Sequence, residues 1–150
     1  MSNPHIERAG SYLRGNEIFI FPVSKATNNL WYDYMPVSRV DINCDDSELG
    51  SIIMDVLSQS TAGINPPESP SPAAIELFRL TGVKGWRQFS KGTIACDISR
   101  INGVVAFAPS HQDDKHGGYS GKNTGEILAP IGSSSTTLGR SLKQALYLSD

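Results

Sequence analysis

The fold is decided by the stretch TIACDISRINGVVAFAP, which spans residues 93–109. Two β-rich runs are separated there by Asn102-Gly103, and both residues accept the positive φ angles of a type I′ turn. The pattern predicts an antiparallel hairpin with strands over residues 93–100 and 104–109. The outgoing strand is almost wholly apolar, so we expect it to be deeply buried and central in a sheet. Alternating apolar residues give the incoming strand one core face: Ile94, Cys96 and Ile98.

The clearest helical pattern lies upstream of this hairpin. Asp45, with Glu48 three residues later, forms a capping pair that marks the start of a helix. The apolar residues that follow recur at i, i+3, i+4, i+7 and i+8: Leu49, Ile52, Ile53, Val56 and Leu57. Such a stripe predicts an amphipathic helix that packs against a sheet or another helix.

Two more helices are predicted from their end signals. Ser71 caps one of them, with Pro72 at its first position and Gly82 at its end. We expect its apolar side to consist of Ile75, Phe78 and Leu80. The closing helix follows a cluster of capping residues at 133–136. Its inward face is expected to carry Leu138, Leu142, Ala145 and Leu146.

The remaining segments complete the expected architecture. Runs of β-branched and aromatic residues predict strands over residues 17–23, 30–35, 38–42 and 126–130. Residues 61–69 and 111–124 are rich in glycine, proline and polar residues, which predicts surface loops. The chain is therefore expected to be α+β, one domain over residues 1–150, with a mostly antiparallel sheet packed by about three α-helices.

Composition excludes several classes of protein. The 39% hydrophobic fraction of these 150 residues is typical of globular and not of disordered proteins. A net charge of -2 with scattered lysines and arginines disfavours direct binding to nucleic acid. No apolar run approaches the roughly 18 residues of a membrane span, and the first residues lack a signal peptide's apolar core. We therefore expect a cytoplasmic protein, in which Cys44 and Cys96 are buried and reduced.

The most suggestive polar cluster is the stretch HQDDKH at residues 111–116. Two imidazoles and two carboxylates lie within six residues there, and zinc accepts ligands of both kinds. The spacing is not that of a helical metal motif, so a solvated loop or a partner contact remains open beside a metal site. The glycine-rich residues 117–123 fail the phosphate-loop pattern, because one position is missing and Asn123 replaces its hydroxyl residue. We expect no catalytic residue, no metal and no cofactor.

The order of these elements resembles the immunity proteins of bacterial contact-dependent growth inhibition (CDI) systems. The resemblance covers residues 37–148. It rests on the helix over 49–57, the step Leu80-Thr81-Gly82-Val83 leading to Trp86 and Phe89, the central hairpin, and Leu138-Gly139 in the last helix. It implies a cytoplasmic, non-enzymatic protein that binds and neutralises the cognate C-terminal toxin domain in a 1:1 complex. The toxin is expected to be a nuclease, in particular a ribonuclease.

A nuclease active site is usually basic, so acidic groups beside an aromatic residue would complement it. Acidic residues cluster in two places. Asp45, Asp46 and Glu48 begin the first helix, where capping explains them. The second group is Asp113 and Asp114, which have no comparable structural role. With their neighbours they form the predicted partner-binding set: Asp113, Asp114, Tyr119, His111 and His116. A small metal-dependent hydrolase that uses the 111–116 loop is the alternative function.

Overall fold

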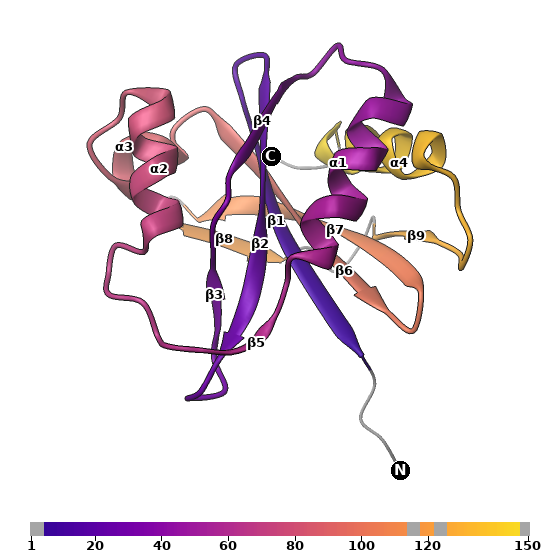
Figure 1. The fold of residues 1–150 in the computed structure, drawn as a ribbon. Coiled ribbons are helices and arrows are strands. Elements are labelled where there is room, and N and C mark those ends of the chain that lie inside the picture. The colour runs from indigo at the N-terminus through magenta and orange to yellow at the C-terminus, as the bar shows by residue number, and fades with distance from the viewer. Residues whose placement is uncertain (1–4, 114–117, 122–125, 148–150) are drawn as a thin grey trace.

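The computed structural model of the chain describes residues 5–113, 118–121 and 126–147. These residues form a nine-stranded sheet and four helices, an α+β architecture with one helix more than predicted (Figure 1). The strands are β1 (Ile6–Arg14), β2 (Glu17–Ala26), β3 (Trp31–Asp33), β4 (Ser38–Asp41), β5 (Ala62–Ile64), β6 (Thr93–Ile101), β7 (Val104–Asp113), β8 (Gly118–Gly121) and β9 (Ile127–Ala129). The helices are α1 (Asp46–Ser58), α2 (Pro72–Thr81), α3 (Trp86–Ser90) and α4 (Ser135–Tyr147).

The strands of the sheet follow the order β3-β2-β1-β6-β7-β8, with β4 and β5 also paired to β2 and β9 paired to β7. The pairing of β5 with β2 is parallel, and the other pairings are antiparallel. The predicted hairpin is confirmed, because Ile101 of β6 lies opposite Val104 of β7. Asn102 and Gly103 have φ angles of 52° and 86° at its turn. The outgoing strand is buried as expected, with Phe107 fully shielded from solvent.

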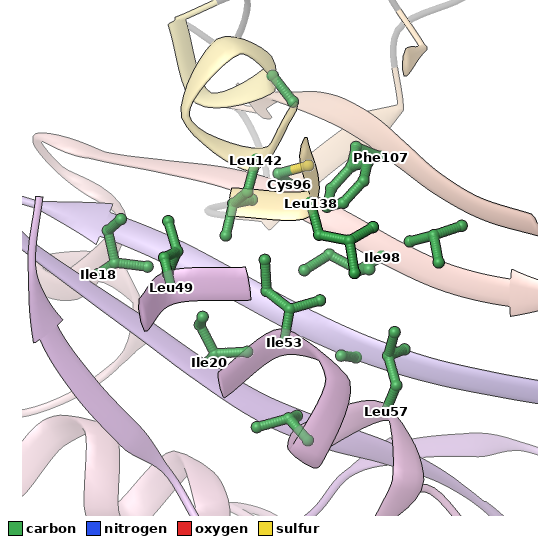
Figure 2. Close-up of a cluster of buried hydrophobic side chains, with 14 of the residues drawn as sticks. Ile18, Ile20, Leu49, Ile53, Leu57, Cys96, Ile98, Phe107, Leu138 and Leu142 are labelled. Carbon is green, nitrogen blue, oxygen red and sulfur yellow. The ribbon is translucent and has the colours of Figure 1, made fainter. Parts of the chain in front are cut away.

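One face of the sheet packs against α1 and α4 (Figure 1). The predicted stripes of both helices are confirmed, and they meet alternate residues of β2, β6 and β7 in one apolar core. Figure 2 shows this core closed around Ile53, which projects from α1. The other labelled members of the core are Ile18, Ile20, Leu49, Leu57, Cys96, Ile98, Phe107, Leu138 and Leu142.

The opposite face carries a second, aromatic core under α2 and α3. The intervening residues of β2 point there, because side chains alternate along a strand. Phe89 of α3 stands edge-on to Tyr12 of β1, with ring centroids 4.9 Å apart. The buried members of this core are Phe19, Phe21, Val23, Leu77, Val83 and Phe89.

The caps of α2 are confirmed. The Ser71 hydroxyl accepts a hydrogen bond from the Ala74 amide at 3.1 Å, and Gly82 ends the helix with a φ of 72°. Its buried face was predicted incompletely, since Ile75 is 55% exposed while Leu77 is fully buried. The shift arises because the small residues Ala73 and Ala74 lie against the protein and turn Ile75 outward.

Two predicted loops contain strands. Residues 62–64 lie within the expected loop over 61–69, yet they pair with β2 as the short strand β5. The predicted loop over 111–124 is wrong in part, because β7 continues to Asp113 and pairs with β8. Glycine-rich and polar residues suit such peripheral strands when backbone hydrogen bonds hold them, although their side chains give no alternating pattern.

Candidate partner-binding site

Three of the five predicted partner-binding residues belong to the β7–β8 pair. In backbone register, His111 is opposite Ser120, and Tyr119 is opposite Gln112. Asp113 ends β7 opposite Gly118. The backbone thus brings His111, Asp113 and Tyr119 to one ribbon, whereas Asp114 and His116 lie outside the described residues. Their role as contacts stays a prediction.

Within residues 5–110 and 126–147, whose side chains the structure describes, no three His, Cys, Asp or Glu side chains are grouped so that they could hold a metal ion. The side chains of the 111–116 stretch lie outside these ranges, so the alternative of a metal-dependent hydrolase is untested. The two cysteines are free thiols, and Cys96 is buried as predicted while Cys44 is only half-buried. Burial in the apolar core raises the pKa of the Cys96 thiol, which disfavours the reactive thiolate.

A second candidate surface is a hollow of about 260 Å³ on the sheet face that carries the aromatic core. We call it the Asp33–Asp97 hollow. Its floor is formed by β1, β2 and β6, and β3 forms one wall. Residues of the aromatic core line one side of it, among them Tyr12 and Phe21.

Strand register explains how its charged residues come together. Val23 of β2 lies opposite Asp33 of β3 on one side and opposite Arg8 of β1 on the other. Asp97 of β6 lies opposite Gly10, two residues along β1 from Arg8. Residues two apart on a strand share a face, so Arg8 stands between the two carboxylates on one side of the sheet.

Gly10 allows the floor of this hollow to form. A Cβ atom at this position would lie 2.5 Å from the ring of Phe21, which packs across the glycine. The ring therefore occupies space that any other residue would need. This close approach explains a glycine in the middle of a central strand, where it otherwise weakens the sheet.

Arg8 does not neutralise the two carboxylates by direct pairing. Its guanidinium lies over the ring of Trp31, 5.1 Å from the centroid, in a cation–π contact. Among the described residues, neither Asp33 nor Asp97 forms an ion pair or a hydrogen bond with a side chain. Both carboxylates therefore line the hollow, while the nearby Arg8 guanidinium is in contact with Trp31 instead.

The protein surroundings disfavour charge on both carboxylates. Burial raises the pKa of Asp33 to about 6, with repulsion from Asp97 adding to the rise and Arg8 opposing it. Burial also raises the pKa of Asp97, and Arg8 again opposes the change. Asp97 nevertheless remains exposed to solvent, whereas Asp33 is half-buried. The hollow thus contains two carboxylates that lack an ion-pair partner among the described residues, and aromatic side chains line one side of it.

The hollow continues into a neighbouring one of about 280 Å³. Trp31 and Asp33 line both. The second hollow is closed by the segment that leads into α2, including Glu68, and by Trp86 of α3. Together they form a recessed surface between β3 and the α2–α3 pair.

The sequence alone did not predict this site, although the alternation that puts Cys96 and Ile98 on the core face puts Asp97 on the opposite face. The signal available was an aspartate in the middle of an otherwise apolar strand, a residue type that strands disfavour. Asp33 and Arg8 gave no comparable signal, because only the pairing of β1 with β2 and β3 brings them near Asp97. Trp31 and Trp86 line the recessed surface and are partly buried against the aromatic core.

Comparisons with known proteins bear on the chain as a whole. No curated protein sequence matches it. A protein of unknown function from Neisseria meningitidis has a similar structure, with a TM-score of 0.81 at 17% identity, over 100% of this chain and 99% of that one. A chain of a CdiA-CT/CdiI toxin and immunity complex from Yersinia pseudotuberculosis superposes with a TM-score of 0.74 at 16% identity, over 99% and 100%. At these identities the likeness shows the shared fold.

Membership of a family is shown by the sequence itself. The family described as "CdiI: CDI immunity protein" matches residues 13–149, which is nearly the whole chain and contains the resemblance noted over residues 37–148. No helix among the described residues is long and apolar enough to cross a membrane. The matched region includes the central hairpin, α1 and α4, whose residues build the main core. The chain therefore belongs to the family of CDI immunity proteins.

Proposed function

We propose that this protein binds the C-terminal toxin domain of a CDI system and neutralises it, and that this toxin is a nuclease. The observation that carries the proposal is the family match over residues 13–149. The complex is expected to be 1:1 and to form in the cytoplasm, where the toxin would act. Inhibition of this kind requires an interface of about 1,200–2,000 Å² that covers the active site or blocks access to it.

The nuclease part of the proposal rests on charge. An enzyme that receives a phosphate backbone presents basic residues, and this chain offers acidic residues on two surfaces. One surface is the β7–β8 ribbon, where Asp113 is described and Asp114 follows it in sequence. We propose that His111, His116 and Tyr119 belong to the same contact. The other acidic surface is the Asp33–Asp97 hollow.

Growth protection and direct binding test the proposal together. The toxin domain encoded beside this gene is expressed with and without this protein, and cleavage of cellular RNA and DNA is followed. Protection, with a tight 1:1 complex by calorimetry, is the expected result. Association should slow as salt rises, with less effect on dissociation, because charge complementarity acts mainly on encounter. A toxin domain that kills equally in both cells, or that cleaves no nucleic acid, would contradict the neutralising role or the nuclease assignment respectively.

A further inference from the structure

We propose that the Asp33–Asp97 hollow receives an arginine side chain of the toxin domain, whose guanidinium would pair with the carboxylates that line it. This inference rests on the proposed function, since it names a contact within the same complex. It concerns a surface separate from the predicted β7–β8 contact, because Asp33 belongs to β3 and Asp97 to the middle of β6.

The first argument is the charge of the hollow. Asp33 and Asp97 have no ion-pair partner among the described residues, and Arg8 is held on the face of Trp31. A buried or recessed carboxylate without a partner is costly, so proteins usually pair such groups. Among the described residues that line the recessed surface, the one further acid is Glu68, which adds negative charge. A positively charged occupant is therefore the complement that the surface lacks.

The second argument is shape. A hollow of about 260 Å³ has room for one long side chain. The planar guanidinium has five donors in a fixed fork, which lets it bond two acceptors at once. A lysine ammonium is a compact point charge and fits two separated carboxylates less well. Aromatic residues such as Tyr12 line the sides, and they pack well against the apolar stem of an arginine.

The third argument is that an arginine in the hollow would stabilise the ionised form of Asp33, which the free protein disfavours. Burial and mutual repulsion disfavour ionised Asp33, and Arg8 offsets them only in part. An arriving guanidinium favours the ionised form, so binding should release a proton at pH values below the pKa of Asp33. Affinity should therefore rise between about pH 5 and about pH 7.5.

The test in the complex compares two doubly substituted proteins that lose the same charge. Asp33→Asn/Asp97→Asn removes both carboxylates of the hollow. Asp41→Asn/Asp55→Asn removes two exposed carboxylates, on β4 and α1, that do not line it. We expect the hollow variant to bind the toxin domain at least tenfold more weakly, about 1.4 kcal/mol, and the control variant to bind as the wild type. Both should keep their thermal midpoints or gain stability.

The toxin-independent test uses N-acetyl-arginine amide as a probe and carbon-13 NMR of the aspartate carboxyl groups. The probe should shift the signals of Asp33 and Asp97 and lower the pKa of Asp33, and N-acetyl-lysine amide should do so more weakly. Neither probe should shift Asp55. Equal binding of toxin by the two double variants, or unshifted hollow carboxyls with the arginine probe, would overturn the inference. Wild-type protein that fails to bind the toxin domain would instead refute the proposed function, and the probe would still decide the chemistry of the hollow.

Discussion

Gly50 of α1 and Gly139 of α4 each face the backbone of the first residue of the other helix. A Cβ atom on Gly50 would lie 1.7 Å from the carbonyl oxygen of Ser135, and one on Gly139 would lie 1.9 Å from that of Asp46. The two helices therefore cross at a distance that only glycine permits at both positions. Near the same crossing, the Lys143 ammonium lies 2.9 Å from the Asp46 carboxylate and lowers its pKa.

Alanine at either glycine should therefore destabilise the fold. We expect Gly50→Ala and Gly139→Ala each to lower the free energy of unfolding by about 3 kcal/mol, because backbone atoms must move apart. Alanine's better helix propensity offsets only about 1 kcal/mol of such strain. Urea denaturation measures the change. Gly85→Ala is the control: it has open space around it and an extended φ of -179°, so its effect should stay within about 0.5 kcal/mol.

The main core gives a second prediction. Ile53 on α1 and Leu142 on α4 are fully buried in the cluster of Figure 2. Replacing either by alanine should cost roughly 2–5 kcal/mol, the sum of lost burial and a residual cavity. Ile75→Ala on α2 is a matched control, because Ile75 is 55% exposed and should lose far less. Urea midpoints that fall equally for all three would contradict the burial described for these helices.

Asp33 should make stability depend on pH in a direction opposite to that of most carboxylates. Its pKa is about 6 in the folded protein against 3.8 for the unperturbed group, so the folded state holds the proton more tightly. Its contribution is therefore most favourable below about pH 4 and is lost as pH rises to about 6. Asp33→Asn should stabilise the protein by roughly 1–3 kcal/mol at about pH 7.5 and by little near pH 4. Thermal melts at both pH values measure this; equal gains at both would contradict the raised pKa.

The predicted acidic contact on the β7–β8 ribbon gives a further test. Reversing both charges, Asp113→Lys/Asp114→Lys, should weaken binding to the toxin domain at least tenfold, about 1.4 kcal/mol. The thermal midpoint is expected to stay unchanged, as for charged residues that serve binding and not folding. Calorimetric titration of a folded variant decides it. Unaltered affinity would show that the β7–β8 ribbon is not part of the interface, and it would not contradict the contact proposed at the Asp33–Asp97 hollow.

Local signals in the sequence predicted the hairpin at Asn102-Gly103, the ends of α2 and the stripes of α1 and α4. Each of these features is encoded within about ten residues, as turn chemistry, caps or helical periodicity. The stripe of α4, for example, needs only Leu138, Leu142, Ala145 and Leu146 to be recognised, and all four are buried.

Strand β1 was missed because its inward face is partly polar. Glu7 and Ser11 point toward the main core, which hides the alternation expected of a strand. Arg100 donates to Glu7 at 2.6 Å, and the Ser11 hydroxyl donates to the Cys96 carbonyl at 2.7 Å. These hydrogen-bond partners lie 93 and 85 residues away in sequence, so no local sequence pattern predicts that Glu7 and Ser11 are buried. The Asp33–Asp97 hollow was missed for the same reason, because its floor is built on β1.

The position of β1 between β2 and β6 has a consequence for how the protein forms during synthesis. The β1–β2 hairpin can close early, but the other edge of β1 has no partner until residues 93–101 are made. Closing so long a loop is entropically costly, and pairings this distant fold slowly. Throughout that interval the nascent chain exposes the edge of its own central strand. A chain stopped before β6 would therefore be prone to aggregation. The main core can close only after α4, which ends at Tyr147, has also been translated.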